Sequence, residues 1–480
     1  MSKIIDTADI CRSFLTSRFH SEDAQHSLQD IRDWMTARNT AHPFKVYLID
    51  FSDMKLWSFE EDSGDLVHES GRFFRVEGLR CNKNYGQIRQ WEQPIINQQE
   101  IGILGFISKE FDGIRHFLLQ AKMEPGNINT IQLSPTVQAT HSNYTQAHKG
   151  KLPTYLEHFL NPEKRILVDQ LQSEQGTRFL KKRNRNIIID CPEDIVLQDD
   201  FIWVTLKQLK ELTALDNHVN MEARSILSCI SLADDAGLVN VRGALAMAPD
   251  NSFAKRLIIS GFEKIRTQYS SEEILQWMTE IKSTLYIRSA YLPLKKLAGG
   301  WQTHADKIIH ESNNFFSIVG VNVAAGSREV AQWTQPLVNS LAEGITGWIC
   351  REIDGVLHFL MKIRFEPGSI DLAELGPTVS STDGNYCIYE NNAPQFIEYF
   401  KQATADSIRH DSRQSAEGGR FYHDTSRCLI VEIDDFDLQV PDNYRWLTLG
   451  QIQNLMNSNN IINVECRDLL ACINYSGQVQ

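Results

Sequence analysis

Long apolar segments are missing from this 480-residue sequence. No stretch approaches the roughly 20 consecutive apolar residues that a bilayer-spanning helix needs. The beginning, MSKIIDTADICRSF, contains acidic residues and no apolar run, which is not the pattern of a secretory signal. We therefore expect no membrane partner and a cytoplasmic location.

The sequence also lacks the patterns that hold disulfides and metals. Its nine cysteines are odd in number and scattered, and no CxxC pair occurs. An HExxH helix and an EF-hand loop are absent, and the 14 histidines are dispersed. We predict reduced, mostly buried thiols and no bound metal.

Nucleotide-cofactor motifs and an excess of positive charge are absent as well. Neither GxGxxG after a predicted strand nor GxxxxGK followed by Ser or Thr occurs, so we expect no cofactor. With 48 Lys and Arg against 61 Asp and Glu, the formal net charge is −13. Such a chain repels polyanions, which argues against a nucleic acid partner, although a small anion can bind in a local pocket.

What the sequence does contain is an internal duplication. A shift of 242 residues aligns HESGRFFRVEG, from His68, with HESNNFFSIVG, from His310. Close to half of the positions from Trp91 to Tyr144 are identical to their counterparts, without a gap. The duplication predicts a first repeat at residues 21–235 and a second repeat at residues 255–480. An N-terminal segment at residues 1–20 precedes them, and a linker at residues 236–254 joins them.

Each repeat is predicted to be α+β, a mixed β-sheet flanked by helices. Residues 22–38 have the apolar spacing of a helix, and Ser270 with Glu273 predicts a capping box before the matching helix. Short runs rich in aromatic and β-branched residues follow and indicate strands. Tight hairpin turns are predicted at Asp112-Gly113 and Asp354-Gly355. Thr205 and Thr448 are predicted to cap the N-termini of later helices.

The two repeats differ most in their polar residues, and the first repeat is the richer one. Residues kept in both repeats are explained by a shared fold, whereas polar residues found in one only are candidates for chemistry in one pocket. Uncharged hydrogen-bonding groups suit a sugar and a pyrimidine base. In the first repeat they are Gln120, Asn127, Gln132, Ser134, Gln138, Ser142 and His148, replaced by Lys362, Ser369, Glu374, Gly376, Ser380, Gly384 and Glu390.

A basic cluster is also confined to the first repeat. It comprises Arg178, Lys181, Lys182, Arg183 and Arg185, whereas the second repeat keeps only Arg420 and Arg427 of the matching segment. Five positive charges could hold a diphosphate, and the alternative is a solvated basic loop at the start of a strand.

Other residues leave two interpretations open. His116 and His358 fit a packing role inside strands, and Trp91 and Trp333 either stack on a base or are buried. The Glu-Pro-Gly that begins at Glu124 is first a turn signal and second a candidate catalytic carboxylate.

The segments HESGRFF, QPIINQQEIGILGF, QAKMEPGN, QLSPTVQAT, SNYT and SEQGTRF with KKRNRN resemble the sugar-nucleotide 2,3-dehydratases of deoxysugar biosynthesis, over nearly the whole chain. The resemblance implies two tandem duplicated Nudix-hydrolase-like domains and a homodimer. It implies a hydro-lyase that removes the C2 hydroxyl of dTDP-4-keto-6-deoxyglucose. The product would be a dTDP-3,4-diketo-2,6-dideoxy sugar, which a separate 3-ketoreductase reduces.

The resemblance and the chemistry of the implied reaction together select candidate residues. Lys122 is the candidate stabiliser of the enolate, and the candidates for the acid and the base are Glu124, Tyr144, His148 and Glu174. The substrate-binding candidates are His68, Arg72, Phe74, Trp91, Gln93, Gln120, Gln132, Thr136, Gln138, Thr140, Asn143, Arg178, Lys182, Arg183, Asn184 and Arg185. The second pocket is expected to be degenerate.

Two other functions fit the same residues. A Nudix-type hydrolase would cleave the diphosphate, but the REx2EE metal-binding helix of that superfamily is absent from the sequence. A non-catalytic nucleotide-sugar binder would use both pockets for binding alone. Dehydration is favoured because the first repeat has the full set of motifs, and the C4 ketone makes an external oxidant unnecessary.

Overall fold

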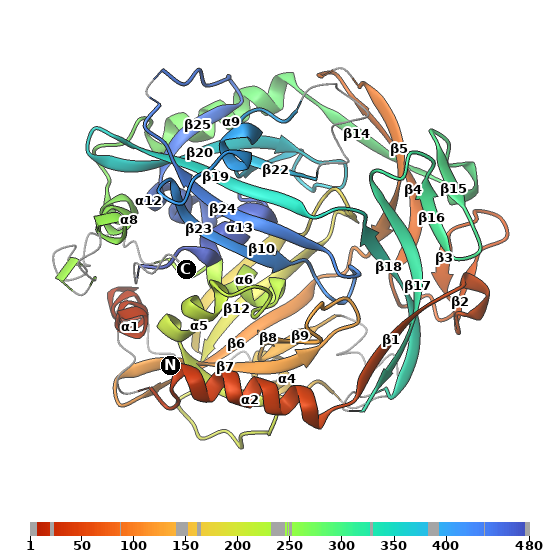
Figure 1. Ribbon diagram of the computed structural model, residues 1–480, viewed down its shortest axis with the longest axis horizontal. Coiled ribbons are helices and arrows are strands. Elements are labelled where there is room, and N and C mark those ends of the chain that lie inside the picture. The colour runs from red at the N-terminus through yellow and green to blue at the C-terminus, as the bar shows by residue number, and fades with distance from the viewer. Residues whose placement is uncertain are drawn as a thin grey trace.

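The computed structural model describes residues 7–19, 24–86, 88–140, 152–160, 165–231, 245–246, 248, 252–326, 330–382, 393–435 and 437–475. It contains two large sheets that have the same strand order (Figure 1). In the first repeat the order is β10 (Arg165–Ser173), β12 (Arg183–Asp190), β6 (Gly102–Phe111), β7 (Ile114–Met123), β13 (Phe201–Thr205), with β8 (Ile131–Pro135) beside β7 and β9 (Val137–Ala139) beside β6. In the second repeat it is β23 (Ile408–Ser415), β24 (Thr425–Glu432), β19 (Gly344–Ile353), β20 (Val356–Phe365), β25 (Tyr444–Thr448), with β21 (Ala373–Gly376) beside β20 and β22 (Val379–Thr382) beside β19.

Both large sheets are mixed, which confirms the predicted α+β duplication. In each, one inner pair is parallel, β12 with β6 and β24 with β19, and the other pairs are antiparallel. The predicted hairpins are present, because Asp112 and Asp354 adopt positive φ between paired strands.

Helices fill the space between the two large sheets (Figure 1). Thr205 and Thr448 cap α5 and α12 through capping boxes, as predicted. One hydrophobic core includes buried side chains of both sheets, such as Phe117 and Phe359, so the repeats are not independently packed. The described helices of this layer are α5 (Leu206–Thr213), α6 (Met221–Ser228), α12 (Leu449–Met456) and α13 (Val464–Cys472).

The outer helices also occur in matching pairs. They are α1 (Thr7–Phe19) with α8 (Ser252–Phe262), α2 (Leu28–Ala41) with α9 (Ser271–Thr284), and the short α4 (Leu156–Leu160) with α11 (Ile397–Lys401). Ser17 in α1 and Ser260 in α8 donate to equivalent carbonyls, those of Arg115 and Leu357. The equivalence of the repeats therefore extends upstream of residue 21.

The helix predicted at residues 22–38 begins later than expected, at Leu28. Ser27 and Asp30 form a capping box, so the first hydrogen-bonded turn is fixed at that point. The matching capping box of Ser270 and Glu273 is confirmed before α9.

Two smaller sheets exchange a strand between the repeats. One contains β15 (Trp301–Thr303), β16 (Lys307–His310), β17 (Phe316–Ala325) and β18 (Gln332–Ser340) of the second repeat, joined by β1 (Phe44–Ile49) of the first. The other contains β2 (Trp57–Phe59), β3 (Leu66–His68), β4 (Arg75–Lys83), β5 (Gln90–Asn97) and β11 (Phe179–Leu180) of the first repeat, joined by β14 (Ile287–Leu292) of the second. Figure 1 shows β1 leaving α2 and running beside β17. Each repeat thus completes a sheet of the other.

The Glu-Pro-Gly turns make a second exchange. The amide of Gly126 donates to the carbonyl of Gly418, and the amide of Gly368 donates to that of Gly176, both at 2.7 Å. A Cβ on Gly126 would lie only 1.5 Å from the carbonyl oxygen of Phe421, so only glycine allows this approach. The turn of each repeat is therefore held by a loop of the other.

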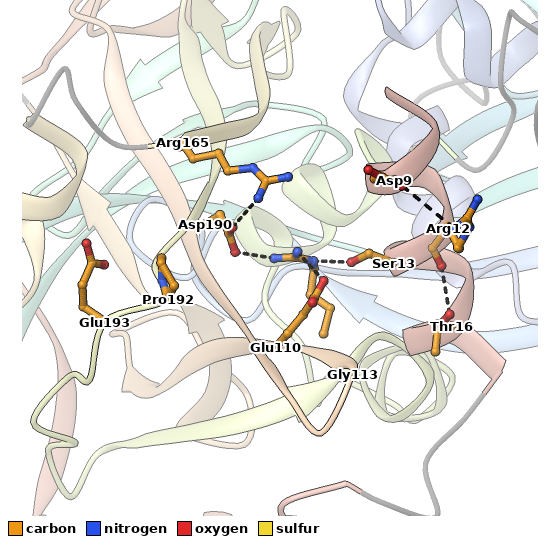
Figure 2. Close-up of a pocket in the computed structure, with 11 residues that line it drawn as sticks. Asp9, Arg12, Ser13, Thr16, Glu110, Gly113, Arg165, Asp190, Pro192 and Glu193 are labelled. Atoms are coloured by element: carbon orange, nitrogen blue, oxygen red, sulfur yellow. Dashed lines mark hydrogen bonds and ion pairs between the residues drawn. The ribbon is translucent and has the colours of Figure 1, made fainter. Parts of the chain in front are cut away.

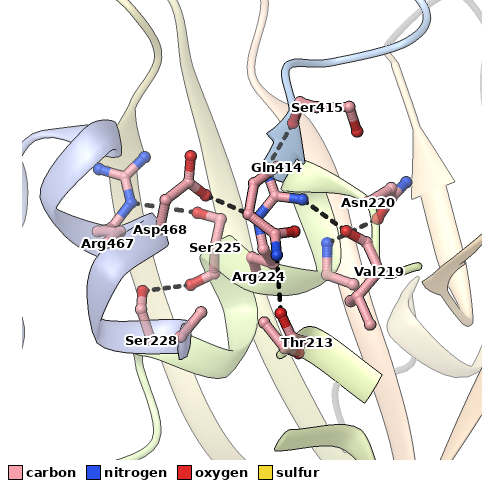
Figure 3. A network of polar contacts seen from close by, with 12 residues as sticks. Thr213, Val219, Asn220, Arg224, Ser225, Ser228, Gln414, Ser415, Arg467 and Asp468 are labelled. Carbon is pink, nitrogen blue, oxygen red and sulfur yellow. Dashed lines mark hydrogen bonds and ion pairs between the residues drawn. The ribbon is translucent and has the colours of Figure 1, made fainter. Parts of the chain in front are cut away.

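A buried polar network joins α6 to α13 near the centre of the molecule (Figure 3). The guanidinium of Arg224, fully buried, donates to Asp468 and to the carbonyl of Ser415. Arg467 donates in the equivalent way to Ser225 and to the carbonyl of Ser173. Burying these cations is tolerable only because each has several acceptors.

At one position of this network the second repeat has a carboxyl group, Glu374, where the first repeat has an amide, Gln132. The hydroxyl of Ser173 donates to Glu374 at 2.6 Å, whereas the hydroxyl of Ser415 donates to the amide oxygen of Gln132 at 3.0 Å. Burial raises the pKa of Glu374 from 4.5 to about 8, against the opposing effects of Ser173 and Arg467.

This pKa predicts how stability depends on pH. Because the folded-state pKa is raised, the contribution of Glu374 is fully present below about pH 4.5 and is lost as the pH rises towards 8. Glu374→Gln, which copies Gln132, should therefore increase the free energy of unfolding relative to wild type by a few kcal/mol more at pH 8 than at pH 5. Urea unfolding at the two pH values measures this, with exposed Glu280→Gln as the control. A difference between variant and wild type that does not change with pH would contradict it.

Candidate functional site

A cavity of about 570 Å³ lies against the large sheet of the first repeat, a size typical of small-ligand sites. The sheet contributes the side chains of β7 and β9 and of the segments that follow them. The lining residues from this sheet and its loops are Gln120, Lys122, Glu124, Pro125, Thr136, Val137, Gln138, Thr140, Pro153, Thr154 and Phe201. A second group, from β2, β3 and their loops, is Lys55, Leu56, Trp57, His68, Phe73 and Phe74.

The second repeat closes the same cavity. Its contribution comes from β17, β18 and the loop before β24, and comprises Asn322, Val330, Gln332, Trp333, Thr334, Gln335, Glu417, Gly419 and Arg420. The hydroxyl of Thr334 accepts from the amide of Lys55 at 2.8 Å, so β18 is fastened to the first-repeat wall. The cavity is thus a product of the strand exchange.

Lys122 and Glu124 form the charged part of the wall. The ammonium of Lys122 lies 3.4 Å from Oε1 of Glu124, and both side chains are at least nine-tenths buried. The amide of Gln138 donates to the same Oε1 at 3.2 Å. Within the described residues, Oε2 of Glu124 is buried and has no hydrogen-bond partner. A buried carboxylate oxygen of this kind is available to a ligand.

Glu222 lies behind this pair and was not found from the sequence. The amide of Gln138 donates to its Oε1 at 2.5 Å while also donating to Glu124. Burial, and then the charges of Glu124 and Glu417, raise the pKa of Glu222 well above its ordinary value. Gln138 therefore bridges two carboxyl groups and fixes the position of Glu124.

Aromatic rings line another part of the cavity. The ring of Trp57 packs 4.9 Å from that of Phe74 and 5.3 Å from that of His68. The guanidinium of Arg420 lies 4.3 Å above the ring of Phe74, and the indole of Trp333 donates to Gln335 at 2.8 Å. These flat surfaces and a cation suit a base and an anionic group.

The cavity brings together eight of the residues predicted to bind or react. These are Lys122, Glu124, His68, Phe74, Gln120, Gln138 and Thr140, together with Thr136, whose hydroxyl is already used by the backbone of Leu118 and Ile107. Tyr144, His148 and Asn143 lie outside the described residues.

The predicted diphosphate cluster is not part of the cavity lining. Arg185 pairs with Asp169 through two bonds of 2.7 Å, and Arg178 stacks on Phe316 at 4.0 Å. The Lys182 ammonium donates to the carbonyl of Glu100 at 2.9 Å, and burial lowers its pKa.

The remaining predicted residues also lie away from the lining. Arg72 is exposed, Arg183 is half-buried on β12, and Gln132 is the buried partner of Ser415. Asn184 donates to Glu174 at 2.6 Å, and burial, with a contribution from Glu417, raises the pKa of Glu174 to about 7.

Trp91 and Gln93 occupy the equivalent positions in the other small sheet. Trp91 donates to Gln93, which donates to the carbonyl of Thr177, just as Gln335 donates to that of Gly419. The strand exchange therefore gives the first-repeat cavity the Trp-x-Gln motif of the second repeat. The sequence signal for Trp333 was present, since the motif occurs in both repeats.

A different cavity, of about 720 Å³, lies between α1 and the β6–β7 hairpin (Figure 2). Its central cation, Arg115, donates to Asp190, Glu110, Ser108 and Ser13, and Arg165 also pairs with Asp190. Because these charges pair with one another, this cavity has the character of a structural salt-bridge network rather than a ligand site.

Among the described residues, no group of three or more His, Cys, Asp or Glu side chains is arranged to hold a metal ion. The eight cysteines in the described part of the chain are buried, as predicted, and none of them forms a disulfide bond. None of the described helices combines the length and the apolar character needed to cross a membrane.

Comparison with known proteins gives one consistent result. A family model described as NDP-hexose 2,3-dehydratase matches residues 28–230 and again residues 271–473. A protein of Amycolatopsis orientalis named dTDP-4-dehydro-6-deoxy-alpha-D-glucopyranose 2,3-dehydratase is 40% identical over 476 residues, which cover 98% of this chain and 95% of that protein. Proteins of the same name from Saccharopolyspora spinosa and Streptomyces violaceoruber are 39% and 40% identical, over 96% and 92% of this chain and 94% and 95% of theirs.

Proposed function

This chain belongs to the NDP-hexose 2,3-dehydratase family, and from that premise we propose that it removes water across C2 and C3 of dTDP-4-dehydro-6-deoxyglucose. It is then a hydro-lyase of deoxysugar biosynthesis, and its product is the dTDP-3,4-diketo-2,6-dideoxy sugar. The observation that carries this proposal is the buried, unpartnered Oε2 of Glu124 beside the ammonium of Lys122 in a ligand-sized cavity.

The chemistry needs a base, and Glu124 is placed to supply it. A ketone at C4 acidifies the proton on C3, so a carboxylate oxygen within reach can remove it. Oε1 of Glu124 is held by Gln138 and Lys122, which leaves Oε2 for the substrate.

Lys122 is placed to stabilise the enolate. When the C3 proton leaves, negative charge moves to the C4 oxygen, where a buried ammonium is most effective because little water screens it. The C2–O bond then breaks, the C4 ketone reforms and C2=C3 appears. Because C3 still carries its hydroxyl, this enol tautomerises to the second ketone.

The aromatic part of the cavity suits the thymine ring, with Trp57, Phe73 and Trp333 as contact surfaces. Arg420 and Lys55 line the cavity and carry positive charges that can bind a diphosphate. We therefore propose these two residues for diphosphate binding, in place of the predicted basic cluster around β12. Tyr144, His148 and Asn143 remain predictions from the sequence.

The second repeat is proposed to be inactive because its equivalent carboxylate has both oxygens engaged. Arg364 occupies the position of Lys122 and lies 3.2 Å from Oε1 of Glu366, and the amide of Gly176 donates to Oε2 at 2.8 Å. The second repeat has Ser380 at the position of Gln138, the residue that bridges Glu124 and Glu222 in the first repeat.

Further features rest on the family resemblance. We propose a Nudix-like fold for each repeat, a homodimer, and a downstream 3-ketoreductase that consumes the diketo product. The bounds 21–235 and 255–480 are proposed for the body of each repeat, to which the equivalent helices α1 and α8 are added at the N-terminal side. The buried cysteines of the described residues, which form no disulfide bonds, support a reducing, cytoplasmic location.

Incubation with dTDP-4-dehydro-6-deoxyglucose, a 3-ketoreductase and reduced nicotinamide tests the function. Mass spectrometry should show loss of one water, dependent on this protein. Release of thymidine monophosphate would indicate a hydrolase, and recovery of the unchanged ketosugar would indicate a binding protein.

Lys122→Met should lower kcat about 10²- to 10³-fold, because it removes the enolate stabiliser while keeping a buried chain of similar length. KM should change little, since the charge on the C4 oxygen develops after binding. Steady-state assays measure both, and a kcat within a few-fold of wild type would contradict the role.

Trp333→Ala should lower kcat/KM about 10- to 100-fold, through loss of an aromatic surface in the cavity. Trp91→Ala, in the same motif of the first repeat, is the matched control and should change kcat/KM less than threefold. The opposite ranking would mean that the motif of the first repeat serves the active pocket.

A further inference from the structure

The loop Glu417–Arg420 belongs to the second repeat but lies on the cavity of the first. Two hydrogen bonds to its backbone carbonyls hold it in place. The carbonyl of Gly418 accepts from Gly126 at 2.7 Å, and the carbonyl of Gly419 accepts from the side chain of Gln335 at 2.8 Å. The loop is therefore a fixed part of the wall.

Two carboxyl groups lie close to one another across Gly419. A Cβ added at this position would be 3.5 Å from Oε1 of Glu124 and 3.5 Å from Oε1 of Glu417. Since both oxygens are near one point, their separation is at most twice that distance. Glycine keeps the space between them open, and both residues line the cavity.

The equivalent loop of the first repeat differs at both positions. It carries Gln175 in place of Glu417 and Thr177 in place of Gly419, and it faces the Glu-Pro-Gly turn of the second repeat. The second acidic group and the open space thus occur together only in the loop that reaches the first-repeat cavity.

We propose that Glu417, contributed by the second repeat, is the general acid that protonates the C2 hydroxyl as it leaves, while Glu124 acts as the base. This inference rests on the proposed function and gives Glu417 the acid role, for which the sequence offered Tyr144, His148 and Glu174. Two carboxyl groups in different environments can divide acid and base work in this way.

The step balances in atoms and electrons. Glu124 takes the C3 proton, and the C–H electron pair forms the enolate. As the C4 ketone reforms, C2=C3 forms, the C2–O bond breaks, and the proton of Glu417 completes the departing water. In the tautomerisation, the C3 hydroxyl proton returns to Glu417 and the proton on Glu124 goes to C2, which restores both groups.

The surroundings of Glu417 favour the protonated form that an acid needs. Burial raises its pKa, and the negative charge of Glu124 raises it further, while Arg420, Lys182 and Lys122 oppose the rise. The same cations place positive charge around the carboxylate that remains after the proton has been given up.

The test is to separate proton removal from loss of water. In D2O, Glu417→Gln should still exchange the C3 proton of dTDP-4-dehydro-6-deoxyglucose for deuterium, because Glu124 and Lys122 are intact. Its rate of water loss should fall about 10²-fold or more. Glu124→Gln should lose both reactions. Glu417→Asp, which keeps an acid, should recover part of the water loss.

Gln175→Ala is the matched control from the other loop and should dehydrate within threefold of wild type. Water loss by Glu417→Gln within a few-fold of wild type would overturn the proposal. So would loss of exchange together with water loss in that variant. If wild type neither exchanges nor dehydrates, the proposed function itself fails, which is a different result.

Discussion

The exchange of backbone hydrogen bonds between the two repeats is the constraint on which the rest of the structure depends. Strand β1 pairs with β17 along six residues, and β14 pairs with β4 along six. Separating the repeats would leave those amides and carbonyls, and the ones at the Glu-Pro-Gly turns, without partners. The strand exchange is also what brings β18 and the Glu417 loop over the sheet that carries Lys122 and Glu124.

This arrangement explains how the surroundings of two equivalent carboxylates can differ in a duplicated chain. Each Glu-Pro-Gly turn follows a strand of the large sheet of one repeat and is bonded to a loop of the other, so either repeat can change the surroundings of one carboxylate. The cavity beside Glu124 is lined by Lys122, Gln138, Glu417 and Gly419. Glu366 is instead bonded to Arg364, and the loop that faces it carries Thr177. The buried Arg224 of α6 and Arg467 of α13 hold the two repeats together, since each donates a hydrogen bond to a backbone carbonyl of the other repeat.

Local signals in the sequence predicted local structure well. The Asp-Gly hairpins and the caps at Thr205, Thr448 and Ser270 are confirmed because turn and cap geometry depend on a few neighbouring residues. Gln120, Lys122 and Glu124 line one cavity because alternate residues along β7 and just after it lie on the same face of the sheet. Gln138 reaches the same cavity from β9, which pairs with β6.

Contacts between the repeats could not be predicted in the same way. Both copies carry the Trp-x-Gln and Gly-x-Arg-Phe motifs, so the sequence does not say which copy serves which pocket, and Trp91 was selected where Trp333 lines the cavity. Charge density in the sequence pointed to Arg178 and Arg185, but each has a partner elsewhere that only the fold brings near. Glu222 and Glu417 gave no signal, since a buried carboxyl group is recognised by its neighbours in space.

The central claim is that one active pocket is built from both repeats. A crystal structure of the protein with bound thymidine diphosphate tests it most directly. The account predicts that the ligand lies in the first-repeat cavity with Trp57 or Phe73 on one side and Trp333 or Arg420, from the second repeat, on the other. A ligand that contacts residues of one repeat alone would contradict it.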